Sequence, residues 1–258
     1  MAETGDTATG RVHLAVDGPV ATLVIDDPDR RNALGIDMYA AVPGLVAEAT
    51  ANEAVRVLVV RGAGEDAFAA GSNITEFREH RLGEAHRYYD QVERAAAEAL
   101  AGASVPVVAA IRGACMGGGL GLALCADLRY AADDALLSVP PGRLGVGYPV
   151  DAAKRLAGVV GRATATEMLL TARQIDATEA LRIGLVHEVV SADELDRVVA
   201  SRCATIASLA PMTLRAARAA LAGHPDSDDL ADACFHSEDL REGLTAFESG
   251  RRPEFHGR

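Results

Sequence analysis

The stretch VPVVAAIRGACMGGGLGL, residues 105–122, joins two kinds of secondary structure. Its apolar, β-branched first half predicts a buried strand, and the apolar residues that follow the glycines predict a helix. Glycine lets the backbone approach a ligand closely, and the first turn of a helix leaves several N–H groups without partners. The positive end of the helix dipole adds to these donors. The stretch therefore predicts a site that stabilises an oxygen with developing negative charge.

Two familiar glycine motifs do not fit this stretch. A phosphate-binding P-loop needs a Lys-Ser/Thr pair after its last glycine, and residues 120–124 contain neither. The dinucleotide-binding fingerprint, started at Gly117, needs a further glycine where the chain has Leu122. Close packing of a helix against a strand also explains a glycine cluster. The glycines alone therefore leave anion stabilisation and packing both open.

A second segment has the same organisation. Residues 55–62, VRVLVVRG, predict a strand, and residues 63–74, AGEDAFAAGSNI, continue through a turn to a further strand and glycine. This glycine gives a second place at which a bare backbone N–H approaches a ligand. The two segments together predict a pair of backbone donors.

Together, the two segments resemble the signature of the crotonase (enoyl-CoA hydratase/isomerase) superfamily. In that family an Ala-Phe-x-Ala-Gly-x-Asp-Ile-like stretch precedes an Ile-x-Gly-x-x-x-Gly-Gly-Gly turn. The resemblance runs from Arg11 to Arg258. Further stretches match the family in the same order along the chain: residues 29–34, 124–127, 179–186 and 237–255.

The resemblance implies an α/β fold, a crotonase-like spiral of ββα units with a C-terminal helical oligomerisation region. The spiral core with the acyl-CoA site is expected over residues 11–200. Residues 201–258 are expected to form helices that pack between subunits, as a homotrimer or a dimer of trimers. Residues 1–10 are small and polar, which is typical of a disordered tail rather than a signal peptide.

The pattern of apolar residues predicts individual elements. Pro211 is expected to begin a helix that runs to Leu221, and a further helical stretch is expected over residues 235–247. Strands are expected at residues 12–16, 21–25, 55–60, 107–111, 127–131 and 186–190.

Composition excludes several classes of protein. The 258 residues carry a net charge of −12, which argues against a nucleic-acid-binding protein, because phosphate neutralisation needs clustered cations. No apolar run has the length of a membrane span, and a cytoplasmic protein is expected. No histidines have metal-ligand spacing, so no metal site is predicted. The four cysteines lack paired spacing and are expected to be buried, reduced thiols: Cys115, Cys125, Cys203 and Cys234.

The resemblance also assigns roles to particular residues. It implies that the backbone N–H groups of Ser72 and Gly118 form an oxyanion hole for a thioester carbonyl. The ligand is then an acyl-CoA thioester, so CoA arrives with the substrate and no separate cofactor is expected. Contacts to this ligand are expected from Arg30, Arg31, Ala33, Ala70, Asn73, Ile74 and Gly117.

The chain departs from the family at the acid–base positions. Hydratases of the family carry one glutamate two residues after the third glycine and another after a proline in the next loop. This chain has Gly121 and Pro141 there. Addition of water to a double bond needs a base that activates the water and an acid that protonates the α-carbon. Neither residue supplies either function, so hydration by paired glutamates is not expected.

Decarboxylation of a malonyl-type thioester is the preferred interpretation, because loss of CO2 forms the enolate without a base. Residues 144–148, LGVGY, resemble a loop of methylmalonyl-CoA decarboxylases that carries an active-site tyrosine. Tyr148 is therefore expected to donate a proton or to orient the carboxylate. Those decarboxylases have a histidine where this chain has Ser72.

Two alternatives stay open. An enoyl-CoA hydratase or isomerase needs an acid–base group from elsewhere, and the polar stretch 76–89 offers Glu76 and His86 if one of them faces inward. The third interpretation is a catalytically inactive acyl-CoA-binding subunit. Loss of both glutamates permits it, whereas the intact glycines argue against it.

Overall fold

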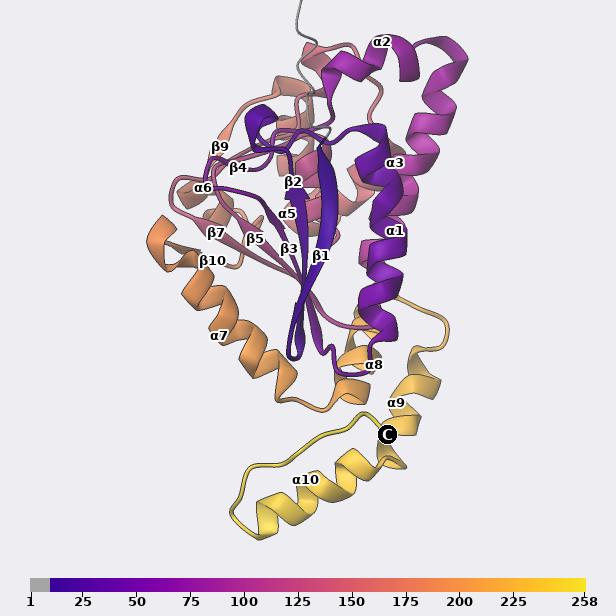
Figure 1. The fold of residues 1–258 in the computed structure, drawn as a ribbon, viewed down its shortest axis with the longest axis vertical. Coiled ribbons are helices and arrows are strands. Elements are labelled where there is room, and N and C mark those ends of the chain that lie inside the picture. Colours follow the sequence, from indigo (N-terminus) through magenta and orange to yellow (C-terminus); the bar gives the residue numbers. More distant parts are fainter. Residues whose placement is uncertain (1–9) are drawn as a thin grey trace, which may run out of the picture.

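The computed structural model describes residues 10–258, so the tail predicted over residues 1–10 lies, but for its last residue, outside the described residues. In this part of the chain the strands form two sheets (Figure 1). The large sheet consists, in spatial order, of β1 (Arg11–Asp17), β2 (Val20–Asp26), β3 (Val57–Gly62), β5 (Val107–Ile111), β7 (Leu128–Ala132) and β10 (Glu188–Val190). The small sheet consists of β4 (Ala67–Ala69), β6 (Ala114–Met116), β8 (Leu136–Ser138) and β9 (Ile175–Asp176).

The six strands expected from the sequence are all present. β5 has the expected bounds, β1, β2 and β7 differ from them by one residue at each end, and β3 and β10 begin two residues later than expected. β3 begins at Val57 rather than Val55, because the N–H groups of Arg56 and Val57 donate to the Pro19 carbonyl at the β1–β2 turn. β10 begins at Glu188, because the preceding His187 accepts a hydrogen bond through Nδ1 from the Arg129 N–H. The hydrogen bond to the His187 side chain competes with regular strand pairing at this position.

The repeating ββα unit expected from the sequence is confirmed. In each of three successive strand pairs the first strand joins the large sheet and the second joins the small sheet: β3 and β4, β5 and β6, β7 and β8. The pairs are followed by α3 (His86–Ala101), α4 (Gly118–Ala123) and α5 (Val150–Thr171). Neighbouring strands β2, β3, β5 and β7 pair in parallel, as do β4, β6 and β8.

Helices cover both faces of the large sheet. α1 (Ile36–Ala51) and α3 lie side by side along one face, and α7 (Leu195–Ala207) covers the other (Figure 1). Leu58 and Val60 of β3 are buried in the main core, whereas Val57 and Val59 pack with the residues of α7. A strand buried on both faces is apolar throughout, which explains the unbroken apolar run in this segment.

The C-terminal region is helical, as expected, but residues 235–247 do not form one helix. The elements are α8 (Pro211–Ala222), α9 (Ser227–Phe235) and α10 (Glu238–Glu248). The break occurs because Ser237 caps α10, its Oγ accepting a hydrogen bond from the Leu240 N–H at 3.1 Å. The last residues return to the start of α10, where the Asp239 carboxylate accepts hydrogen bonds from the N–H groups of His256 and Gly257 at 2.7 and 2.9 Å.

α10 projects away from the sheets (Figure 1). Its exposed face carries large apolar side chains at helical spacing: Leu240, Leu244 and Phe247. An exposed apolar face is typical of an interface, and assembly of this region into trimers or pairs of trimers stays a prediction. None of the helices within residues 10–258 is long and apolar enough to cross a membrane.

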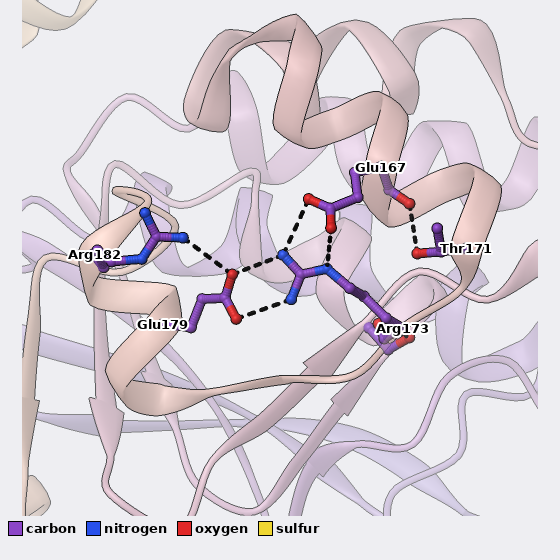
Figure 2. Close-up of polar contacts among 6 residues, drawn as sticks. Glu167, Thr171, Arg173, Glu179 and Arg182 are labelled. Carbon is purple, nitrogen blue, oxygen red and sulfur yellow. Dashed lines mark hydrogen bonds and ion pairs between the residues drawn. The ribbon is translucent and has the colours of Figure 1, made fainter.

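An ion-pair cluster fixes the end of α5 to α6 (Ala177–Arg182). Figure 2 shows Arg173 between the carboxylates of Glu167 and Glu179, with Arg182 on the far side of Glu179. The Arg173 guanidinium binds Glu179 through two nitrogens, at 2.9 and 2.7 Å. The Arg173 carbonyl accepts a hydrogen bond from Ser138 Oγ at the end of β8. This cluster therefore holds α5 and α6 against the small sheet, near the loop that follows β8.

Asn32 connects the loop after β2 to the β3–β4 turn. It is buried, with φ of 58°, and its side-chain amide donates hydrogen bonds to the carbonyls of Ala63 and Ala67 at 2.9 and 2.7 Å. Its side-chain carbonyl accepts a hydrogen bond from the Asp27 N–H at 3.0 Å. The Asn32 side chain therefore forms hydrogen bonds with three backbone groups, which belong to two segments far apart in the sequence.

Asn32→Ala is expected to lower the free energy of unfolding by about 2–4 kcal/mol, because it leaves these backbone groups without partners. Urea denaturation followed by circular dichroism measures the loss. The matched control is Asn52→Ala, since Asn52 is exposed and accepts one hydrogen bond from the Ala54 N–H. Equal losses in the two variants would contradict the role assigned to Asn32.

Candidate active site

A cavity of about 130 Å³ lies where the loops after β4, β6 and β8 meet α3. The loop after β4 contributes Ser72, the loop after β6 contributes Gly118, and the loop after β8 contributes Tyr148. The remaining wall is mainly apolar, with Ile74 and Phe77 among its residues. The structure thus brings the three residues expected to be catalytic to one cavity.

Gly118 and Gly119 show why the chain needs glycine after β6. A Cβ on Gly118 would fall on the hydroxyl of Tyr39 and lie 2.9 Å from Ser72 Oγ. A Cβ on Gly119 would lie 2.5 Å from the Ala69 carbonyl oxygen of β4. Both glycines therefore serve close packing, Gly119 of α4 on β4 and Gly118 against the hydroxyls of Tyr39 and Ser72. Anion stabilisation by this backbone stays a prediction.

The N–H groups of Ser72 and Gly118 donate no hydrogen bond to any of the described residues 10–258. Their neighbours along the chain do, because the Asn73 N–H donates to Leu34 and the Gly117 N–H donates to Ser138, each at 2.8 Å. Ser72 and Gly118 therefore each line the cavity with an unpaired backbone N–H, next to a neighbour in the chain whose N–H is paired. This arrangement is suited to an oxyanion, which backbone N–H groups bind without reorganisation.

Glu93 places a carboxylate in the same cavity, and the sequence analysis missed it. Its side chain is 19% exposed and lines the cavity from α3. Burial raises the pKa of Glu93 above its ordinary value, and the positive charge of Arg81 partly offsets this rise. A signal was present in the sequence, since Glu93 lies at helical spacing between the buried residues Tyr89 and Ala96 of an otherwise amphipathic helix.

Arg81 holds the Glu93 carboxylate and is itself held by aromatic rings. The Arg81 guanidinium pairs with Glu93 at 3.0 Å and with Asp90 at 3.3 Å. It also lies over the rings of Phe77 and Tyr89, 5.1 and 4.5 Å from their centroids. Cation–π contacts and two ion pairs fix this side chain, which is only 9% exposed, at the cavity wall.

The hydroxyl of Tyr148 is buried and has no hydrogen-bond partner among residues 10–258. Burial raises the pKa of Tyr148, and the nearby negative charge of Glu93 raises it further. The phenol is therefore protonated at neutral pH and available as a donor. A buried hydroxyl without a partner at a cavity wall is suited to a polar group of a ligand.

A second cavity of about 490 Å³ adjoins the first. Glu93, Gly118 and Tyr148 line both cavities. Pro141 lines the first cavity and Gly121 lines the second, and these are the two positions at which the resemblance would have glutamates. A Cβ on Gly121 would meet no atom within 4 Å, so this position is open space.

The residues expected to contact CoA and the acyl group divide between two hollows. Ala70, Ile74 and Gly117 line the first cavity. Arg30, Ala33 and Asn73 line a separate hollow of about 300 Å³ on the other side of the loop after β4. Arg31 lines none of these cavities, but its carbonyl accepts a hydrogen bond from the Ala70 N–H at 2.9 Å.

Glu76 and His86 do not face the first cavity, so the expectation that one of them supplies the acid–base group is not supported. The Glu76 carboxylate accepts hydrogen bonds from the Ile36 N–H at the start of α1, at 2.9 Å, and from Asn73 Nδ2, at 2.8 Å. It therefore serves to cap α1. His86 is exposed at the first position of α3, at the edge of the second cavity.

Cysteine and metal chemistry have no support at this site. Cys115, Cys125 and Cys203 are buried, and burial raises the pKa of the latter two thiols to about 11. Thiols in this state are poor nucleophiles. Within the described part of the chain, no group of three or more His, Cys, Asp or Glu residues could hold a metal ion.

Comparisons with known proteins bear on this arrangement. Residues 16–258 match the profile of the family described as Enoyl-CoA hydratase/isomerase. A crotonyl-CoA hydratase of Syntrophomonas wolfei is 32% identical over 245 residues, covering 92% of this chain and 94% of that protein. The peroxisomal Delta(3,5)-Delta(2,4)-dienoyl-CoA isomerase of Arabidopsis thaliana is 31% identical over 260 residues, covering 93% of each.

A solved structure has the same fold as this chain. The crystal structure of an enoyl-CoA hydratase/carnithine racemase from Magnetospirillum magneticum superposes with a TM-score of 0.92 at 35% identity, covering 97% of each chain. The expected crotonase fold with C-terminal helices is thereby confirmed. The chain belongs to the enoyl-CoA hydratase/isomerase family of the crotonase superfamily.

Proposed function

We propose that this protein is an enoyl-CoA hydratase or isomerase in which Glu93 is the acid–base group. The observation that carries the proposal is the Glu93 carboxylate, mostly buried, in the cavity that holds the unpaired N–H groups of Ser72 and Gly118. The relatives described above are named hydratases and an isomerase, which supports chemistry on an unsaturated acyl-CoA.

The two N–H groups stabilise the charge that develops on the thioester oxygen. Protonation or deprotonation at the α-carbon passes through an enolate, whose oxygen carries the negative charge. Donors aimed at that oxygen bind the transition state more strongly than the substrate and so increase the rate. Since Ser72 and Gly118 contribute only backbone groups, this part of the site is independent of their side chains.

Glu93 both takes and returns the proton. In isomerisation its carboxylate removes a proton from the α-carbon of a 3-enoyl thioester and returns it to the γ-carbon, which moves the double bond. In hydration it takes a proton from water as the water oxygen bonds to the β-carbon, and then protonates the α-carbon. One carboxylate therefore suffices for either reaction. A pKa raised by burial suits a group that gives and accepts a proton near neutral pH.

Decarboxylation, the preferred interpretation of the sequence, becomes the second candidate. Tyr148 favours it, because this residue lines the cavity and its buried hydroxyl has no partner among residues 10–258, so the phenol can orient a carboxylate or protonate an enolate. The carboxylate of Glu93 argues against it, since a malonyl-type group at the α-carbon would bring a second negative charge into the same small cavity. The names of the relatives also favour hydration or isomerisation.

A mixed panel of acyl-CoA thioesters, incubated with the pure protein and analysed by liquid chromatography and mass spectrometry, separates the candidates. Gain of water by a 2-enoyl thioester, or conversion of a 3-enoyl thioester to its isomer at constant mass, would support the proposal. Loss of CO2 from a malonyl-type thioester, abolished in Tyr148→Phe, would establish decarboxylation instead. An unchanged panel of thioesters that bind tightly would favour the inactive binding subunit.

Glu93→Gln is expected to lower kcat by about 100- to 10,000-fold with little change in KM, because glutamine keeps the shape of the side chain but cannot carry the proton. Steady-state kinetics on the thioester that the panel identifies measures this effect. Glu98→Gln is the control, since Glu98 lies on the same helix but is exposed. Wild-type activity in Glu93→Gln would contradict the proposal.

The pH dependence tests the same residue. Glu93 acts as a carboxylate, so kcat/KM is expected to fall as the pH drops through its raised pKa. Arg81→Met removes the positive charge that lowers this pKa, so the acidic limb of the profile should move to higher pH. Arg78→Met, on the neighbouring exposed arginine, should leave the profile in place. An acidic limb that stays fixed in Arg81→Met would show that another group titrates.

A further inference from the structure

The second cavity holds one arginine to which the structure gives no partner. Arg155 lies on α5, is half-buried and lines this cavity. Its guanidinium forms no ion pair or hydrogen bond with any residue in the range 10–258. Its planar set of N–H donors is therefore available to a ligand in the cavity.

The other charged groups around this cavity are accounted for. Arg94 pairs with Asp151 at 3.1 Å, and both side chains are about half-exposed. Asp90 and Glu93 share the guanidinium of Arg81, on the side of the cavity that adjoins α3. Glu98 and His86 are exposed at its rim. Arg155 is therefore the arginine of this cavity that has no carboxylate partner among residues 10–258.

The position of the cavity connects Arg155 to the proposed chemistry. Glu93, Gly118 and Tyr148 line both cavities, so an acyl chain whose thioester lies at Gly118 can continue past Tyr148 into the second one. The path is open, because a Cβ on Gly121 or on Gly147 would meet no atom within 4 Å. Arg155 and Tyr148 line this second cavity together.

We propose that Arg155 binds the carboxylate at the far end of a dicarboxylic acyl chain, so that the substrates are enoyl-CoA thioesters of dicarboxylic acids. This proposal rests on the proposed function in placing the thioester at Ser72 and Gly118. Guanidinium matches carboxylate because its planar donors meet both oxygens at once. The far carboxylate lies in the second cavity beyond Tyr148, whereas a carboxylate at the α-carbon would lie in the small first cavity with Glu93.

Binding of saturated thioesters tests this subsite without requiring turnover. Isothermal titration calorimetry would compare glutaryl-CoA and adipoyl-CoA with pentanoyl-CoA and hexanoyl-CoA, which have equal chain lengths but end in methyl. Arg155→Gln is expected to weaken the two carboxylate-ended ligands by about 10- to 100-fold and the methyl-ended ligands by less than about twofold. Arg155→Lys should recover part of the loss, because it restores the charge but not the planar fork.

Arg94→Gln is the matched control, since Arg94 lines the same cavity but already has a partner in Asp151. It should affect both ligand series equally. Equal binding of the two series by the wild type would overturn the subsite. So would an equal loss for both series in Arg155→Gln, which is the effect of a structural arginine. Unchanged binding of the methyl-ended ligands in Arg155→Gln also shows that the variant is folded.

Turnover of the matching 2-enoyl thioesters separates this proposal from the proposed function. If the methyl-ended thioesters react and depend on Glu93 but Arg155→Gln changes neither series, the subsite fails and the function stands. If no thioester reacts while adipoyl-CoA binding depends on Arg155, the function fails and the carboxylate subsite stands.

Discussion

Two backbone segments, one after β4 and one after β6, line the same cavity, and the space beside Gly118 in the second of them is too small for a side chain. The hydroxyls of Tyr39 and Ser72, 3.0 Å apart, occupy the place where a Cβ of residue 118 would stand. Parallel pairing of β4 with β6 brings the segments together, and a bridge between Leu34 and Ser72 fixes the first of them. The positions of the Ser72 and Gly118 N–H groups are therefore a consequence of sheet register, since backbone donors keep their positions only while the strands that carry them stay paired.

A second constraint is the burial of charge beside that site. Glu93 would be costly in a mostly apolar cavity without the guanidinium of Arg81, which packs over the rings of Phe77 and Tyr89. The pair does not neutralise the cost of burial completely, since the pKa of Glu93 stays raised. A raised pKa of this kind is typical of functional carboxylates, because it allows the group both to accept and to release a proton near neutral pH. The cavity therefore contains a carboxylate that a helix, α3, supplies.

The fold and the presence of Ser72 and Gly118 at one cavity were largely predictable from the sequence, because they rest on local signals. Apolar runs gave the strands, and the glycines after β4 and β6 indicated where the backbone is bare. Tyr148 was found from its loop, and the structure brings it to the same cavity as Ser72 and Gly118. Glu93 was missed because a glutamate in a polar helix is usually solvated. Glu76 was expected as an acid–base candidate because it is close to the site in the sequence. Its carboxylate instead caps α1.

The sequence by itself determined which segments form strands and helices and where backbone donors are exposed, because side-chain period and glycine act over a few residues. Only the tertiary structure decided which charged side chains face the cavities. Arg94 and Arg155 look alike in the sequence, yet Arg94 pairs with Asp151, whereas Arg155 lines the second cavity without a partner among residues 10–258. Whether a charged side chain is solvated, paired or available to a ligand depends on side chains of other helices and strands that pack beside it. The local sequence does not contain that information.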